Sequence, residues 1–399
     1  MASGQVNGFE SSEPAMVKNV SQSNKRAPVF GPDFAFTASM HHEECSFSFT
    51  KARQKTMLST ASQAPKINRQ VRFLRSAMGA SLVASAFLST AQAQLPAPTP
   101  NRVYVSSEKD NSIQVFDSQG ARVAAIDVCK RPRHMQFSRD HRQIYVSCGD
   151  SNQMGLVDVA SAKMTGTVAL GDSPEIFDLS PDGKVAYVSI EDENVMAAYD
   201  LQSKAKLFEV KTGGEPEGIL VMPDGKHAYV TSEVANVVHL VDLAQRKVVK
   251  NIRVGNRPRR FVLAAGGKEL WVSNELGASV SIVNTDDQSV KQTLAFKVKG
   301  MRASDITPVG MALSPDGKTV WVALGRANHV AEVDRASREV RNTILVGKRA
   351  WGLTVHPDGK TVYVANGLSD DMTLIDTAAG KAVRSVAAGR VPHSVLVQP

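Results

Sequence analysis

The chain is 399 residues long and carries a formal charge of +8, with 47 Lys and Arg against 39 Asp and Glu. Apolar residues make up 42% of it, which is enough for a packed core and excludes wholesale disorder. Three cysteines are too few for a disulfide-dense fold. No run of about 18 uncharged apolar residues is present, so we expect no membrane span. Length alone suggests two or three domains, unless one large all-β fold takes most of the chain.

Most of the excess charge lies in the first 93 residues, which contain 10 Lys and Arg and 5 Asp and Glu. An apolar stretch over residues 77–88 follows a basic one and precedes the small-residue site Ala91-Gln92-Ala93. This is the three-part pattern of a cleavable secretory signal. We therefore predict a signal peptide over residues 57–93, cleavage after Ala93 and a periplasmic protein. The basic stretch consists of Lys66, Arg69, Arg72 and Arg75.

Residues 1–56 are polar and aperiodic, and they end just before Met57. A secretory signal is normally read from the extreme N-terminus, so we predict that translation starts at Met57. Residues 1–56 are then an upstream extension from a misplaced start. The alternative is a disordered extension that is really made. Any peptide from residues 1–56 in mass spectra of the native protein would contradict the misplaced start.

The remaining sequence, residues 94–399, repeats one unit seven times. An aromatic residue followed by valine recurs at intervals of 41, 42, 42, 42, 50 and 42 residues. Several copies follow a Pro-Asp-Gly-Lys turn such as the one at Pro181, and Asp-Gly between apolar runs is a strong hairpin signal. The pairs begin at Tyr104, Tyr145, Tyr187, Tyr229, Trp271, Trp321 and Tyr363.

A unit of 40–45 residues with four strands has the size of a propeller blade. We therefore predict an all-β fold, a seven-bladed β-propeller of four-stranded antiparallel blades, over residues 94–399. The repeat begins without its first strand and ends in the unpaired strand Ser394-Val395-Leu396-Val397. We expect this last strand to complete blade one and close the ring.

Gly-x-x-Pro bends, such as Gly171 to Pro174, are expected on the face opposite the Asp-Gly turns, around the channel mouth. Structural turns should repeat, whereas the residue after each bend proline varies in chemistry, which favours a binding surface. These residues are Arg133, Glu175, Glu217, Arg259, Val309, Trp351 and His393. The predicted site also includes His134, Arg260, Glu108, Glu191, Glu233, Glu275 and Arg326.

Two pairs of neighbouring residues, Arg259-Arg260 and Arg133-His134, have the chemistry to hold a carboxylate by bidentate hydrogen bonds, and a PQQ-like tricarboxylate would suit them. The alternative is a structural ring of ion pairs in which Arg and Glu neutralise one another. Trp351 either stacks on a planar ligand or plugs the channel. His393 has no second ligand at metal spacing, so we expect no metal site. We also expect no catalytic residue.

Cys129 replaces the bend glycine after blade one, and Cys148 ends the second strand of blade two. Both are expected near the mouth, either bridged or as two free thiols. The insertion at residues 296–306 carries basic residues and is either a lid or docking element or an ordinary solvated loop. No Cys-x-x-Cys-His occurs, which excludes covalently attached c-type haem.

The repeat resembles the YVTN family of β-propellers, and the segment most similar to that motif is Tyr229-Val-Thr-Ser. An ordered set of further motifs resembles the PQQ-dependent catabolism-associated β-propeller proteins. That resemblance implies a periplasmic protein acting beside a quinoprotein alcohol dehydrogenase, its cytochrome or an associated transporter component. PQQ would be present by association only. The motifs begin at Tyr104, Ser173, Glu191, Glu215, Arg257 and Gly347.

We therefore predict an exported, non-catalytic binding or docking propeller of quinoprotein alcohol catabolism. No nucleophile–base pair is identifiable from the sequence, but a propeller enzyme such as a lactonase is the first alternative. A nucleic-acid-binding or surface-binding propeller is the second. After residue 93 the chain holds 37 Lys and Arg and 34 Asp and Glu, an excess of only +3, so we expect no nucleic acid partner.

Overall fold

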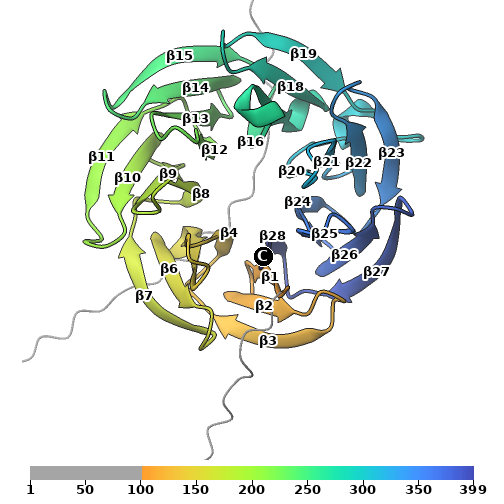
Figure 1. The fold of residues 1–399 in the computed structure, drawn as a ribbon, viewed down its shortest axis with the longest axis horizontal. Coiled ribbons are helices and arrows are strands. Elements are labelled where there is room, and N and C mark those ends of the chain that lie inside the picture. Colours follow the sequence, from red (N-terminus) through yellow and green to blue (C-terminus); the bar gives the residue numbers. More distant parts are fainter. Residues whose placement is uncertain (1–100) are drawn as a thin grey trace, which may run out of the picture. The chain divides into compact units, whose positions relative to one another are not determined.

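The computed structural model describes residues 101–399, which form seven four-stranded antiparallel sheets arranged in a ring (Figure 1). The predicted seven-bladed propeller is therefore confirmed. The expectations for the signal peptide and for residues 1–56 lie outside the described residues. Within residues 101–399 no helix has the length and apolar character that a membrane span requires.

Each blade runs from an innermost strand at the channel to an outermost strand at the rim (Figure 1). Blade one contains β28 (Pro392–Val397), β1 (Val103–Ser107), β2 (Ser112–Phe116) and β3 (Arg122–Asp127). Blade two contains β4 (Pro132–Phe137), β5 (Gln143–Cys148), β6 (Gln153–Asp158) and β7 (Lys163–Ala169). Blade three contains β8 (Pro174–Leu179), β9 (Val185–Ile190), β10 (Val195–Asp200) and β11 (Lys206–Lys211).

The other four blades repeat this order. Blade four contains β12 (Pro216–Val221), β13 (His227–Ser232), β14 (Val237–Asp242) and β15 (Lys247–Arg253). Blade five contains β16 (Pro258–Ala264), β17 (Glu269–Asn274), β18 (Ser279–Asn284) and β19 (Val290–Ala295). Blade six contains β20 (Met311–Leu313), β21 (Thr319–Ala323), β22 (His329–Asp334) and β23 (Val340–Leu345). Blade seven contains β24 (Ala350–Val355), β25 (Thr361–Asn366), β26 (Asp371–Asp376) and β27 (Lys381–Ala387).

In the described residues the connections contain four short 3₁₀ helices, η1 (Gly149–Ser151), η2 (Ala265–Gly267), η3 (Glu275–Gly277) and η4 (Ala303–Asp305). The two ends of the propeller meet in blade one, where β28 pairs antiparallel with β1. The register places Val103 opposite Val397 and Val105 opposite Val395. The predicted non-covalent closure is therefore confirmed.

The space between blades is filled by the aromatic residues of the repeat. Tyr229, Trp271 and Tyr363 are among the largest fully buried side chains. The aspartates that end the third strands bind turn N–H groups, as expected: Asp117 accepts from Gln119 and Ala121 at 2.9 and 2.8 Å. These repeated residues build the blades.

One polar residue in the loop between the second and third strands fixes the next mouth bend. Asn111 accepts a hydrogen bond from the Arg131 N–H at 3.1 Å, and Asn236 accepts one from the Arg257 N–H at 2.8 Å. Asn152, Asn194, Asn328 and Asp370 make the equivalent contact in their blades. Blade five has Ala278 at this position, which cannot cap a bend, and the insertion follows it.

The insertion at residues 296–306 connects blade five to blade six. Phe296, Val298 and Ile306 are buried in the core between these blades. Lys297 and Lys299 are exposed. The segment is therefore a packed connection with a basic outer edge.

Candidate functional site

The hydroxyl residue that follows the aromatic-Val pair holds the main chain of the mouth in the next blade. Its hydroxyl donates to the carbonyl oxygen of the residue after the bend. The bonds run from Ser106 to Arg133, from Ser147 to Glu175, from Thr231 to Arg259 and from Ser273 to Val309, at 2.7, 2.6, 3.2 and 2.7 Å. The repeat motif thus fixes where the variable mouth residues stand.

The mouth opens into a cavity of about 450 Å³ that is lined mainly by charged side chains. It contains many of the predicted site residues, which are Glu108, Arg133, Glu191, Glu217, Arg259, Glu275, Arg326 and Trp351. It is also lined by three arginines that are not among the predicted site residues, Arg131, Arg257 and Arg349, and by Leu276. We call the cavity formed by all of these residues the mouth cavity.

The other predicted residues lie elsewhere. His134, Arg260 and His393 line a second cavity of about 400 Å³ along the channel, and Trp351 contributes to both cavities. The side chains of Glu175 and Glu233 are only 1% exposed and line neither cavity. The expected single ring is therefore divided over two levels of the channel.

Each of the three additional arginines lies directly before the proline or alanine of its mouth bend. The arginines themselves have a left-handed backbone conformation. Their φ angles are 55° at Arg131, 55° at Arg257 and 58° at Arg349. Non-glycine residues rarely adopt this conformation, so the sequence gives little reason to expect it. The sequence pattern that could have identified two of these arginines is the Arg-Pro-Arg motif, which begins at Arg131 and again at Arg257.

Glu217 lies at the centre of the charged side chains and is 2% exposed. Its carboxylate is 2.8 Å from Arg260 Nη2 and 3.5 Å from Arg259 Nη2. Arg259 and Arg260, which were expected to hold an external carboxylate together, therefore already share the internal carboxylate of Glu217.

The surrounding carboxylates are paired in the same way. Glu175 lies 2.7 Å from Arg133 and 3.1 Å from Arg131, and Glu233 pairs with Arg259 and lies 2.6 Å from Arg257. The structural ion-pair alternative is thus what the geometry shows for the buried residues. We call this set the ion-pair layer: Arg133, Glu175, Glu217, Glu233, Arg259 and Arg260.

Burial acts differently on the three carboxylates of this layer. Burial opposes ionisation of Glu217, but Arg259, Arg260 and Arg133 outweigh it and lower its pKa to about 2. Burial raises the pKa of Glu233 to about 7 and raises that of Glu175 well above its usual range, against the attraction of the neighbouring arginines. Glu217 is therefore the carboxylate whose ionised form the layer favours most.

Two arginines are disfavoured by their surroundings. Burial, Arg259 and Arg133 lower the pKa of Arg260 to about 10, against the attraction of Glu217. The pKa of Arg349 is lowered by burial and by the same two arginines, against the attraction of Glu108 and Glu275. Arg349 lines the mouth cavity and Arg260 lines the second one, so each cavity is lined by an arginine whose charge is opposed by burial and by neighbouring arginines.

Trp351 lines both cavities and is 6% exposed. The Arg349 and Arg259 guanidinium carbons lie 4.0 and 5.1 Å from its ring centroid. Two cations therefore already contact this ring, which favours the plug over the stacking platform. Its indole Nε1 is buried and has no hydrogen-bond partner among the residues that the structure describes.

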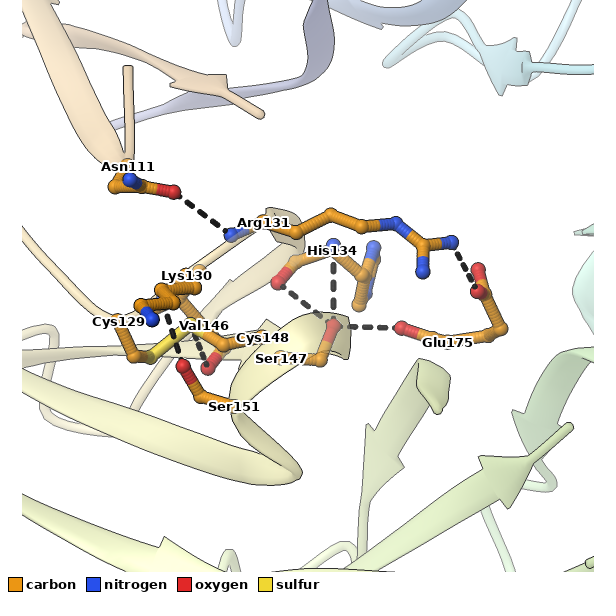
Figure 2. The surroundings of a disulfide bond; sticks show 10 residues. All are labelled: Asn111, Cys129, Lys130, Arg131, His134, Val146, Ser147, Cys148, Ser151 and Glu175. Carbon is orange, nitrogen blue, oxygen red and sulfur yellow. Dashed lines mark hydrogen bonds and ion pairs between the residues drawn. A yellow bond between two sulfur atoms is a disulfide. The ribbon is translucent and has the colours of Figure 1, made fainter. Parts of the chain in front are cut away.

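Cys129 and Cys148 form a disulfide, with their Cα atoms 5.8 Å apart (Figure 2). In other blades a glycine holds the position of Cys129 and packs closely against the end of the second strand, as Gly255 does against Asn274. The disulfide thus replaces a contact that the repeat already makes. Figure 2 shows Arg131 extending from this bend toward Glu175.

Removing this disulfide is expected to lower the free energy of unfolding by about 3 kcal/mol, because the loop that it closes in the unfolded chain has 19 residues of separation. The measurement is urea unfolding of the double variant Cys129→Ser, Cys148→Ser against the oxidised protein. Reductant should reproduce the loss in the native chain and have no effect on the variant. A difference below about 1 kcal/mol would contradict the expectation.

Within the described part of the chain, no group of three or more His, Cys, Asp or Glu side chains could hold a metal ion. His393 lies instead 3.3 Å from Arg260 and 4.0 Å from Glu108. Burial and the nearby Arg133 and Arg260 hold its pKa well below the usual range, so it is a neutral hydrogen-bonding group.

Comparison with known proteins places the chain among propellers. A family model described as lactonase, 7-bladed beta-propeller, matches residues 241–399. No curated protein matches the sequence. The chain is similar to Kuenenia stuttgartiensis hydrazine synthase, with 21% identity and a TM-score of 0.61 over 73% of this chain and 99% of that one.

Two further solved structures resemble it. A functionally unknown protein from Desulfotomaculum acetoxidans has 15% identity and a TM-score of 0.63, over 75% of this chain and 99% of that one. A dihydro-heme d1 dehydrogenase has 14% identity and a TM-score of 0.59, over 77% and 78%. Similarities at these identities concern the fold alone.

Proposed function

We propose that this chain is an exported binding propeller, without catalytic activity of its own, that serves PQQ-dependent alcohol oxidation outside the cytoplasm. In this proposal its mouth cavity binds a planar ligand with several carboxylates, such as PQQ, or the exposed acidic group of a PQQ enzyme. The observation that carries the proposal is an arginine-rich cavity in which some cations have no carboxylate partner.

Arg326 and Arg349 are those cations. Among residues 101–399, neither has a carboxylate oxygen within 4.0 Å, and both line the mouth cavity. Arginine presents a planar fork of donors that matches a carboxylate. The unpaired guanidinium groups and the cavity volume of about 450 Å³ suit a small polycarboxylate.

The ion-pair layer gives this cavity a fixed floor. Arg259 and Glu217 are 5% and 2% exposed, and their partners hold them in place. Such preorganisation lowers the ordering cost of binding. The ordered motifs from Tyr104 to Gly347 that resemble PQQ-associated propellers give the proposal its substrate class.

We expect the exported protein to bind PQQ in isothermal titration, and Arg349→Gln and Arg326→Gln each to weaken that binding about tenfold or more, because each removes a charged hydrogen-bond donor. Arg122→Gln, on the outermost strand β3, is the matched control and should leave affinity unchanged. No binding of PQQ, or binding that ignores both mouth variants, would rule out PQQ as the ligand. Unimpaired growth on alcohols after gene deletion would rule out the catabolic role.

A lactonase is the second candidate, because the lactonase family model matches residues 241–399. Glu217, which lines the mouth cavity, and the buried Glu175 beneath it are the carboxylates that such chemistry would draw on. Hydrolysis of a sugar lactone that disappears in folded Glu175→Gln and Glu217→Gln variants would establish it. Failure of the wild-type protein to hydrolyse sugar lactones would remove this candidate.

A further inference from the structure

The second cavity lies along the channel and shares Trp351 with the mouth cavity, while Arg260 of the ion-pair layer lines only the second cavity. All seven innermost strands or the residues directly before them contribute to its lining. These strands run from the mouth bends toward the Asp-Gly turns, so the cavity is on the turn side of the layer. We call it the turn-side channel. Its volume of about 400 Å³ falls within the range of small-molecule sites.

Polar groups gather at the end of this channel nearest the ion-pair layer. Arg260, with a side chain 14% exposed, contacts Glu217 at 2.8 Å and His393 at 3.3 Å. Both contacts use Nη2, so neither uses the Nη1 and Nε donors. Trp351 also lines the channel, and its buried Nε1 has no partner in the described part of the chain. A buried donor without a partner is uncommon in native structures.

The charge at this end favours an anion. His134 is a neutral imidazole there, because burial and Arg260 lower its pKa to about 3. Glu217 is shared by Arg259 and Arg260, so it does not fully compensate either. Asp178 also faces the channel, but its carboxylate accepts hydrogen bonds from Gln136 at 3.1 Å and the Val221 N–H at 2.8 Å.

The part of the turn-side channel nearer the Asp-Gly turns has partly apolar walls. Its lining includes the apolar residues Leu220, Ala312 and Leu396. The site thus offers a cationic fork and an indole donor at one end and partly apolar walls along its length. Its chemistry matches a molecule with an anionic head and a short alkyl tail.

We propose that the turn-side channel is a second, separate binding site for short-chain aliphatic carboxylates, with the carboxylate on Arg260 and the alkyl chain directed toward Ala312. Arg260 Nη1 and Nε and the Trp351 indole supply the donors. Its anchor, Arg260, lines this channel and not the mouth cavity, so the site is distinct from the one proposed for PQQ.

The test is isothermal titration of the exported protein at neutral pH with acetate, butyrate and hexanoate. Affinity should rise roughly two- to fourfold per methylene, because each added group leaves water for the channel. Arg260→Met should weaken hexanoate binding about tenfold or more. Equal affinity for acetate and hexanoate, or no binding of any of the three, would overturn the proposal.

Two variants keep the test independent of folding and of the mouth. Ala312→Phe narrows the channel without touching an arginine and should abolish hexanoate binding. Arg326→Gln changes a side chain that lines the mouth cavity and not the turn-side channel, and it should leave hexanoate affinity unchanged. Hexanoate binding that survives Ala312→Phe, or that is lost in Arg326→Gln, would place the ligand outside the turn-side channel.

Discussion

Deletion of residues 394–399 is expected to unfold the propeller or to lower its melting temperature by more than 15 °C, roughly the shift that several kcal/mol produce. The deletion removes most of β28, which pairs with β1 and closes the ring. Val395 and Val397 are 9% and 8% exposed and pack with Val103 and Tyr363. Burial of each such side chain contributes about 1.5–3 kcal/mol, so the loss approaches the whole stability of a typical domain.

A shorter deletion separates ring closure from a general effect of truncation. Removal of Gln398 and Pro399 alone keeps the ladder between β28 and β1 and should cost little. Addition of a peptide with the sequence of β28 should partly restore the melting temperature of the longer deletion, because the closure is non-covalent. A longer deletion that melts like the intact protein would show that the ring is stable without β28.

The fold was predictable because each blade repeats the same local signals. The aromatic-Val strands, the Asp-Gly turns and the aspartates at strand ends occur in nearly every copy, so errors in one blade are corrected by the others. Ala265-Gly266-Gly267 departs from the common turn, yet blade five still forms around Trp271. Closure followed from counting strands at the two ends of the repeat.

The site was only partly predictable, because its residues vary where the blades repeat. Arg259 and Arg260 are adjacent on β16, but they line different cavities, and both bind Glu217. Sequence spacing does not reveal that a buried glutamate of another blade has already paired with them. Arg349 was missed because its role depends on a left-handed backbone at the bend.

The disulfide shows that comparison between blades could have settled more. Gly213 packs against Ser232, and Gly255 packs against Asn274, at the positions that Cys129 and Cys148 occupy in their own blade. A repeat that brings these two positions together in every blade would bring two cysteines together as well. The sequence alone does not show this contact, because it depends on the folded blade, in which the bend that enters a blade packs against the end of that blade's second strand.

Glu217→Gln is expected to destabilise the protein by about 3–5 kcal/mol at pH 7. The variant keeps the volume of the side chain but removes the charge that Arg259 and Arg260 share. Those guanidinium groups remain buried, and Glu175 and Glu233 are weak substitutes because burial raises their pKa values. Urea unfolding measures the loss, and the same change at exposed Glu209, which pairs with Lys206, should cost at most about 1 kcal/mol.

The pH dependence of this difference identifies its electrostatic origin. The pKa of Glu217 falls from 4.5 to about 2 on folding, so its stabilisation is complete above pH 4.5 and is lost as the pH falls toward 2. The native protein should therefore lose its advantage over Glu217→Gln within that window. A difference that stays constant from pH 5 to pH 2 would assign the effect to packing, and equal stability at pH 7 would show that the ion-pair layer tolerates three arginines without this carboxylate.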